Sequence, residues 1–339
     1  MTLPLVHAGG NNGAMGRAHG RVLATEIHAA ASFYNKLAQR KAGLGPAYEQ
    51  LGPFIDATKQ HLPRLADEVE GLAEGAEIDA EVAWFFNCME EVWPFEACTT
   101  LVTDRWLMHA EQWYAGHVGV GVVVARPDNG PAFISPTCAG FLPAVGLNAA
   151  GFAQGIDSLT TTDDRIGIPR LIVSRSSLGA QNLQDAVTNA TRAQRAGGYS
   201  HVLAANGQTL IVETTATRSA TLVEERAHTN HVLSRDLAPV ASDSSDGSLA
   251  RLNRAVELLE TSPPKSIEDC MRLLGDHDSQ PQSICHHEGQ DLAASATVFG
   301  MICDLQTGVV AVSGGRPCSS EWEEHVVPGF VSAEASHVG

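Results

Sequence analysis

The sequence predicts an α+β fold in which two largely antiparallel β-sheets form a layered sandwich with helices, preceded by a helical segment. Residues 1–95 carry a mostly helical pattern, whereas runs rich in Val, Ile and Thr dominate from Cys98 to about residue 233. Two helical patterns, 168–179 and 182–196, separate two groups of strand patterns. Strands, then paired helices, then further strands are typical of a layered sandwich. We therefore expect a helical leader at 1–97 and a core at 98–339.

The leader is predicted to consist of four helices. They run from Met15 to about Arg40, over 46–61, over 63–75 with Pro63 in the first turn, and onward from an N-cap at Asp79. Residues 9–13, Gly-Gly-Asn-Asn-Gly, are predicted to form a loop with no convincing strand before it. The Lys-Ser/Thr pair of a phosphate-binding loop is missing, so we interpret these glycines as structural.

The last leader helix ends in two carboxylates, Glu90 and Glu91, shortly before Cys98. Charged residues at a helix end are usually solvated, and we favour that interpretation. The alternative is that one of the two carboxylates faces the cysteine.

After the leader the pattern predicts strands, because β-branched runs alternate with turn signals such as Pro127-Asp128-Asn129-Gly130. The predicted strands are 98–103, 106–113, 118–125, 131–136, 144–147, 151–157, 200–205, 208–214, 219–224 and 228–233, followed by a closing hairpin of 296–303 and 309–313. Ser248 and Ser266 are expected to cap two helices between these groups.

The acidic composition of the chain disfavours negatively charged binding partners. Among 339 residues, 22 Lys and Arg face 39 Asp and Glu, a formal net charge of −17. Nucleic acids and anionic membranes both require basic patches, so we expect neither as a partner. The start lacks the basic residues of a signal peptide, and no apolar run reaches membrane-spanning length. With seven scattered cysteines and no C-x-x-C pair, we expect reduced thiols in a cytoplasmic protein.

Cys98 is the strongest candidate for chemistry, although a buried, inert thiol is the common role of a free cysteine. It stands where helix gives way to the first strand of the core, after the small residue Ala97. Attack of the thiol on the Ala97 carbonyl would give an N-to-S acyl shift, and water would then release Cys98 as a new N-terminus. Its α-amine, with a pKa near ~7.7–8.0, could act as the base for its own thiol.

Three further groups of residues could join it. In His228-Thr229-Asn230-His231 the Asn230 amide could hold an oxyanion, and His228 could contact substrate. Glu111-Gln112-Trp113-Tyr114 ends the strand that should pair with the first one, so its side chains could lie beside the thiol. In Ser283-Ile284-Cys285-His286-His287-Glu288 a metal site is conceivable, but neighbours in so short a run seldom surround one tetrahedral ion. With no second ligand pair evident, we predict no metal and place His286 or His287 near the site mouth, the alternative being an ordinary surface histidine.

These motifs together resemble those of the acyl-coenzyme A:6-aminopenicillanic acid acyltransferase family, the C45 peptidase group of N-terminal nucleophile (Ntn) hydrolases. The resemblance runs along nearly the whole chain, through the segments 16–20, 70–75, 97–100, 146–151, 228–231, 283–287 and 314–318. It implies an αββα sandwich and self-cleavage between Ala97 and Cys98 into a small and a large subunit. It also implies Cys98 as nucleophile and Asn230 as a residue on the oxyanion side.

The sequence departs from the family pattern at three places. The family usually has Asn-Trp-Asp where this chain has Gln112-Trp113-Tyr114, Arg where it has His286, and Gly where it has Ala97. The missing aspartate could be replaced by Glu111 or Asp104. Loss of a carboxylate and an arginine changes the charge that a pocket tolerates, so the family's substrates are not carried over.

The prediction is a self-processing cysteine amidohydrolase that cleaves a small amide through a thioester on Cys98. Asn230, Glu111 and Tyr114 are predicted to assist, and Thr99, Gln112, Trp113, His286 and His228 to contact substrate. No cofactor is expected, with a coenzyme A thioester as an optional co-substrate and a homo-oligomer left open. The alternatives are an acyl-coenzyme A-dependent N-acyltransferase, a non-catalytic relative that binds a small amide, and an unprocessed Cys-His hydrolase that uses His286 or His228.

Overall fold

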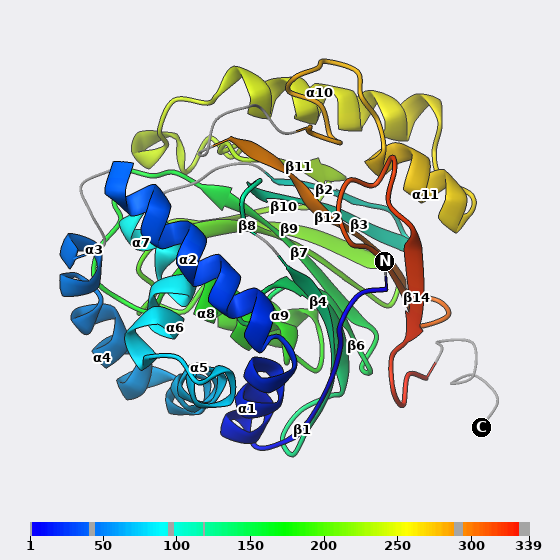
Figure 1. Ribbon diagram of the computed structural model, residues 1–339. Helices are drawn as coiled ribbons and strands as arrows, with labels where there is room; N and C mark the ends of the chain where they lie inside the picture. The colour runs from blue at the N-terminus through cyan, green and yellow to red at the C-terminus, as the bar shows by residue number, and fades with distance from the viewer. Residues whose placement is uncertain (1, 41–44, 94–97, 118, 288–293, 332–339) are drawn as a thin grey trace.

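The computed structural model describes residues 2–40, 45–93, 98–117, 119–287 and 294–331, and it confirms the predicted α+β sandwich (Figure 1). One sheet has eight strands in the order β1 (Leu5–Gly10), β4 (Val120–Pro127), β5 (Phe133–Cys138), β6 (Gly146–Asn148), β7 (Phe152–Leu159), β8 (Gly198–Ala205), β9 (Gln208–Thr214) and β10 (Ser219–Leu222). The other has six, in the order β11 (Ala227–His228), β2 (Cys98–Val102), β3 (Trp106–Tyr114), β12 (Ser295–Asp304), β13 (Val309–Ser313) and β14 (Trp322–Val326).

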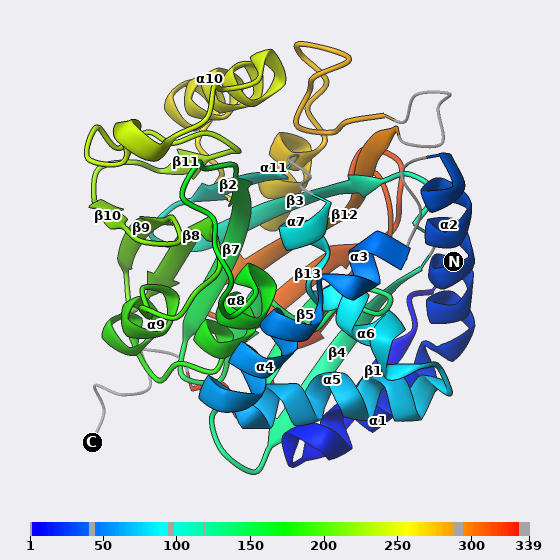
Figure 2. The ribbon, with the colours of Figure 1, turned by 90° about the vertical axis from the view of Figure 1, so that its left-hand side faces the viewer.

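The two sheets pack face to face, and each carries helices on its outer face. Helices α8 (Arg170–Leu178) and α9 (Leu183–Ala190) cover the eight-stranded sheet, and α10 (Asp246–Thr261) and α11 (Ile267–Leu274) cover the six-stranded sheet. The layers can be followed from top to bottom at the left of Figure 2, where α10 is followed by β2, then β7, and then α8 with α9. The result is a four-layer αββα sandwich.

Side-chain alternation explains why both sheets are buried on both faces. Along β12, Met301 and Cys303 enter the core between the sheets, whereas Ile302 packs with Leu273 and Leu274 of α11. A strand buried on both sides reads as a nearly continuous apolar run, which is the pattern that the sequence shows.

The leader comprises α1 (Asn12–Val22), α2 (Ala24–Arg40), α3 (Gly45–Glu49), α4 (Gly52–His61), α5 (Pro63–Ala76), α6 (Ala80–Asn87) and α7 (Met89–Val92). Helices α1 and α5 lie unusually close together because each presents two glycines to the other. A Cβ on Gly16 or Gly20 would lie 2.0 or 2.1 Å from a carbonyl oxygen of α5, and one on Gly71 or Gly75 would lie 2.3 or 2.2 Å from a carbonyl oxygen of α1. Two of the segments that carry the family resemblance are thus helix-packing motifs.

The leader is also joined to the core. β1 pairs in parallel with β4, and Arg175 of α8 donates from Nε and Nη2 to the two carboxylate oxygens of Glu68 in α5, at 2.9 and 3.1 Å. Both side chains are buried, so this pair ties the two segments across the predicted cleavage point. The division into subunits at residues 97 and 98 stays a prediction.

Several predicted elements differ from the observed ones. The prediction of a loop at 9–13 is wrong for residues 9 and 10, because Leu5–Gly10 is a strand. Its Val6 and Ala8 are buried in the core. The predicted helix 46–61 is divided between α3 and α4, and 182–196 is helical only to Ala190. The predicted strand 228–233 ends at His228, and β14 was not predicted. Among the described residues, no helix has both the length and the apolar character needed to span a membrane.

Candidate active site

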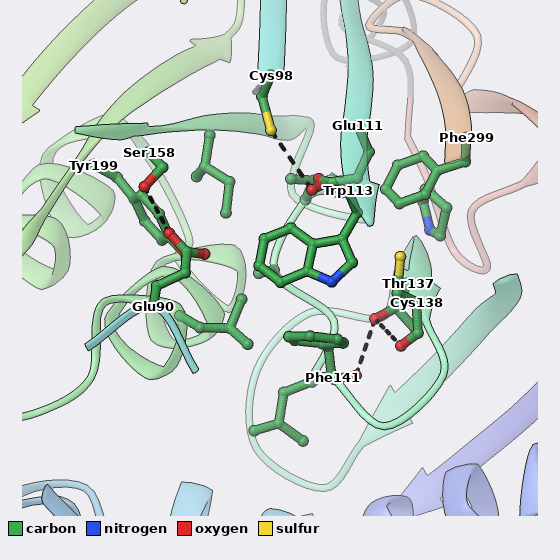
Figure 3. Close-up of a pocket in the computed structure, with 16 residues that line it drawn as sticks. Glu90, Cys98, Glu111, Trp113, Thr137, Cys138, Phe141, Ser158, Tyr199 and Phe299 are labelled. Atoms are coloured by element: carbon green, nitrogen blue, oxygen red, sulfur yellow. Dashed lines mark hydrogen bonds between the residues drawn. The ribbon is translucent and has the colours of Figure 1, made fainter. Parts of the chain in front are cut away.

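Cys98 is the first residue of β2, and its side chain enters a pocket between the two sheets (Figure 3). The side chain is only 7% exposed. Antiparallel pairing with β3 sets Cys98 opposite Glu111 and Thr100 opposite His109. Because alternate residues of a strand face the same side, these four side chains share one face of the sheet.

The backbone nitrogen of Cys98 is held by Asn230. It donates to Asn230 Oδ1 at 2.9 Å, and Arg251 Nη2 donates to the same oxygen at 2.7 Å. The Asn230 Nδ2 in turn donates to the Ser158 carbonyl at 3.1 Å, and the Asn230 backbone N–H donates to Ser248 Oγ at 2.8 Å. Two donors therefore converge on the amide oxygen of Asn230, which fixes how its side chain is oriented.

The thiol of Cys98 begins a chain of buried polar groups. Sγ donates to Glu111 Oε1 at 3.5 Å, and Glu111 Oε2 lies 3.0 Å from His109 Nε2. His109 Nδ1 lies 2.8 Å from Thr100 Oγ1, which donates to Asp157 Oδ1 at 3.1 Å. This chain connects the nucleophile candidate to a buried carboxyl group on the opposite sheet and offers a route for a proton.

Burial sets the protonation of the two ends of this chain, Cys98 and Asp157. It raises the pKa of the Cys98 thiol well above its ordinary value, and the nearby Glu111 and Asp157 carboxylates raise it further. Burial likewise raises the pKa of Asp157 well above its usual range. The thiol is therefore protonated at neutral pH and becomes a nucleophile only when a nearby base takes its proton.

The pocket below the thiol is mainly apolar and has a cavity volume of about 60 Å³. Its walls come from both sheets, from α7 and α8, and from the connection between β5 and β6. They include Trp113, Phe141, Leu142, Val145, Ile156, Leu171 and Phe299. Trp113 occupies the middle of the view in Figure 3. Its indole Nε1 donates to Tyr34 Oη of the leader at 2.6 Å, so the leader helps to orient the pocket wall.

Glu90 also lines this pocket, and the interpretation of Glu90 and Glu91 as solvated charges is wrong. Ser158 Oγ and Tyr199 Oη donate to the two oxygens of Glu90 at 2.6 and 2.5 Å. Burial nevertheless raises the pKa of Glu90 to about 7, although Arg170 and these donors oppose the shift. Glu91 accepts from the Arg170 backbone N–H and Nε at 2.9 and 3.0 Å. The geometry supports the alternative interpretation, in which one of the two carboxylates lies on the cysteine side.

Of the predicted residues, Cys98, Glu111 and Trp113 line the pocket, and Asn230 contacts the Cys98 backbone nitrogen. Ala97 lies outside the described residues. Thr99 faces the opposite side of β2, where its Oγ1 accepts from Arg251 Nε at 3.2 Å. It thus supports Arg251 and Asn230 from behind and does not line the pocket. Asp104, the other proposed replacement for the family aspartate, does not line the pocket either.

The remaining predicted residues do not line this pocket. Gln112 points away from it and donates to the carbonyls of Ser283 and Ile284 at 3.4 and 2.9 Å. Tyr114 packs against Phe33 and Tyr34 of the leader. The half-buried His286 has its Nδ1 against the Pro281 carbonyl.

His228 has a structural partner. Its Nε2 lies 2.8 Å from Glu213 Oε1 and its Nδ1 lies 2.6 Å from the Thr229 carbonyl oxygen, and both side chains of the His228–Glu213 pair are fully buried. Glu213 also accepts from the backbone N–H groups of Leu233 and Ser234 at 2.6 and 2.9 Å. The pair therefore shapes the 228–234 loop that presents Asn230. Neither His228 nor His286 is placed to serve an unprocessed Cys-His hydrolase.

Sequence reasoning missed Thr100, His109, Asp157 and Arg251. The first two could have been found from strand register, because they flank Cys98 and Glu111 with period two on paired strands. Asp157 and Arg251 carried no local signal, since they lie on the opposite sheet and on a covering helix.

The fold and the site together define a class. A four-layer αββα sandwich with a cysteine at the start of an inner strand, its backbone nitrogen and its thiol both facing polar partners, is the arrangement of an Ntn hydrolase. The chain belongs to the acyl-coenzyme A:6-aminopenicillanic acid acyl-transferase family, whose model matches residues 102–318. Membership places it among enzymes of the amidohydrolase and acyltransferase class. The match begins just after Cys98, so the assignment of the nucleophile depends on the site geometry.

Two solved structures that match this chain share little sequence with it. A mutant conjugated bile acid hydrolase from Clostridium perfringens has 8% sequence identity and a TM-score of 0.43, covering 72% of this chain and all of that chain. A penicillin V acylase from Agrobacterium tumefaciens has 11% identity and a TM-score of 0.43, covering 67% of this chain and 85% of that chain. Curated proteins give no match. Identities this low leave activity and substrate to be argued from the site.

Proposed function

We propose that the protein is a self-processing cysteine amidohydrolase that cleaves a small amide with an apolar acyl group. The observation that carries the proposal is that the backbone nitrogen and the thiol of Cys98 each have their own polar partner. Asn230 Oδ1 holds its backbone nitrogen at 2.9 Å, while its thiol faces an apolar pocket and a carboxylate. One residue thus has its nitrogen and its sulfur oriented separately, as a nucleophile that uses its own amine as base requires.

Self-cleavage would begin at the thiol. As Sγ bonds to the carbonyl carbon of Ala97, its proton passes toward Glu111 Oε1, which lies 3.5 Å from Sγ. The C–N bond then breaks, and the Cys98 nitrogen takes the proton, which leaves a thioester. Water adds to that thioester, releasing a carboxylate on residue 97 and restoring the thiol.

In each turnover the freed α-amine takes the thiol proton as Sγ attacks the substrate carbonyl. The amine then gives that proton to the leaving nitrogen. Asn230 Oδ1 accepts a hydrogen bond from the amine and so turns the nitrogen lone pair toward Sγ. Water resolves the acyl-enzyme, and the carboxylic acid leaves.

The pocket supports an apolar acyl group. Aromatic and aliphatic walls favour burial of hydrocarbon, at about 25 cal/mol for each Å² removed from water. Among the polar groups that line it, Ser158 and Tyr199 both donate to Glu90. A charged acyl chain would have to displace those bonds and is disfavoured.

Intact mass spectrometry of the purified protein tests the processing step. Fragments of residues 1–97 and 98–339 are expected, and Cys98→Ala should remain one chain. If the wild-type chain stays uncut and the Cys98 thiol does not react with acylating probes, the protein is instead a non-catalytic relative that binds a small amide.

The family assignment favours one second candidate, transfer of an acyl group from a coenzyme A thioester to an amine. Both candidate reactions pass through the acyl-enzyme. They differ in the acyl donor, which is an amide or a thioester, and in the acceptor, which is water or an amine. A panel of short-chain and aryl-acyl amides, assayed with and without acyl thioesters, distinguishes them. Acid released from the amide alone supports the hydrolase, whereas product formed only with a thioester donor supports the transferase.

A further inference from the structure

Two imidazoles and two thiols converge on a point in the segments that flank β12 and β13. They are His277, Cys285, His287 and Cys318. The four ligand atoms all lie within 4.8 Å of one another. The first three residues belong to the connection between α11 and β12, and the fourth to the connection between β13 and β14. None of the four lines the pocket below Cys98.

The distances in this cluster fit a tetrahedral ion. Zn²⁺ binds histidine nitrogen at about 2.0–2.1 Å and cysteine sulfur at about 2.3 Å, so a tetrahedron has N···N edges of about 3.3 Å and N···S edges of about 3.5 Å. Here His277 Nε2 lies 3.0 Å from His287 Nε2, and Cys318 Sγ lies 3.4 Å from His287 Nε2. Small adjustments of the side chains would bring the four atoms to these edges.

The backbone that carries the ligands is held in place by the rest of the fold. The Cys285 N–H donates to the Asp276 carbonyl at 2.9 Å, and the His286 N–H donates to Thr297 Oγ1 at 2.9 Å. Gln112 of β3 donates to the carbonyls of Ser283 and Ile284. A turn in which the Ser319 and Ser320 N–H groups donate to the Arg316 carbonyl presents Cys318. The ligand positions are therefore largely preorganised.

We propose that these four side chains form a structural zinc site: His277, Cys285, His287 and Cys318. Two thiolates and two neutral imidazoles are a ligand set that Zn²⁺ prefers, and four protein ligands close its coordination shell. The ion would replace the two thiol protons and fasten the α11–β12 connection to the β13–β14 connection. Sequence reasoning rejected a metal because Cys285 and His287 had no evident second pair, and folding supplies that pair from residues 277 and 318.

Zinc binding would require the Arg316 side chain to change its contact with His287. Arg316 Nη1 lies 3.5 Å from His287 Nδ1. An imidazole bound to zinc through Nε2 carries its proton on Nδ1, so the guanidinium cannot donate there when the ion is present. The guanidinium would then have to turn to another acceptor, such as a ligand thiolate.

Metal analysis of the full-length protein, purified without chelator, tests the proposal. We expect about one zinc per chain in the wild type and in His61→Ala, a control that removes an exposed histidine of α4. Cys318→Ser and His277→Ala should retain less than about a tenth as much. Zinc at the same level in all four proteins, or in none, would overturn the site.

A second measurement needs no variant. Cys318 is exposed, so a free thiol there should react quickly with iodoacetamide. We expect the wild type to be protected at Cys318 until a strong chelator is added, and Co²⁺ in place of zinc to give the intense visible bands of a tetrahedral thiolate site. Rapid labelling before chelation, or a Cys285–Cys318 disulfide found by peptide mapping of the unreduced protein, would refute zinc binding.

Discussion

Cys98 and Asn230 stand 132 positions apart in the chain, yet the backbone nitrogen of the first donates to the side-chain oxygen of the second at 2.9 Å. The contact joins the first strand of the core to the loop after β11. It depends on two buried supports, Arg251 on the Asn230 oxygen and the His228–Glu213 pair within the loop. The nitrogen that self-cleavage would free is thus bound before any cleavage takes place.

The first prediction concerns this contact. Asn230→Ala removes the acceptor that orients the Cys98 nitrogen, so self-cleavage and amide turnover should both slow by about 10²-fold or more. Fragment formation followed by intact mass over time measures the effect. Asn206→Ala, in the turn between β8 and β9, is the matched control and should process at the wild-type rate. An Asn230→Ala protein that folds and processes normally would remove Asn230 from the mechanism.

The second prediction concerns Glu111. Glu111→Gln keeps the shape but removes the carboxylate that faces the thiol, so the cleavage rate should fall by about 10²–10⁴-fold. Glu111→Asp should recover part of the rate, because it restores a base at a longer distance. Glu224→Gln, an exposed glutamate after β10, should change nothing. Unaltered processing in Glu111→Gln would show that another group accepts the thiol proton.

The third prediction concerns stability and pH. The folded-state pKa of Glu90 is about 7, above its usual value of 4.5. Between these values the folded protein keeps a proton that the unfolded chain has lost, so the stability from this group is complete below about pH 4.5 and disappears as the pH rises through 7. Denaturant titrations should show that the wild type loses more stability than Glu90→Gln between pH 5 and 7.5, by on the order of 3 kcal/mol at most.

The comparison of Glu90→Gln with the wild type isolates this group from Asp157, whose raised pKa contributes a slope of the same sign to both proteins. Glu74→Gln, an exposed glutamate of α5, should reproduce the wild-type slope. Parallel curves for Glu90→Gln and the wild type would mean that Glu90 stays ionised in the folded protein.

The fourth prediction concerns the leader. In Gly20→Ala the new methyl group would lie 2.1 Å from the Leu72 carbonyl oxygen, so α1 and α5 must move apart. The free energy of unfolding should fall by about 1–3 kcal/mol. Gly52→Ala, at the start of α4, meets no atom within 4 Å and should be neutral or slightly stabilising. Equal stability of Gly20→Ala and the wild type would show that the helices are not held by this close approach.

Strand register accounts for most of what could be predicted from the sequence. The hairpin predicted over 98–103 and 106–113 was enough to pair β2 with β3 and to place residues 111–114 near Cys98. The observed register, with the period of two along a strand, then selects Glu111. The same rule places Thr100 and His109, which the sequence reading passed over. β1 was missed because its residues are followed by a Gly/Asn run that reads as a loop, whereas pairing with β4 makes it a strand.

The sequence by itself determined the layered α+β architecture, the candidate nucleophile Cys98 and its neighbour Glu111. All of these follow from local periodicity and from residues close in the chain. Tertiary structure alone decided that Asn230 presents an oxygen to the Cys98 nitrogen, that Glu90 faces the pocket, and that two cysteines and two histidines meet beside β12. Each depends on which segments pack together, and burial then fixes the protonation of the groups enclosed. Neither packing nor burial is encoded at any one position of the chain.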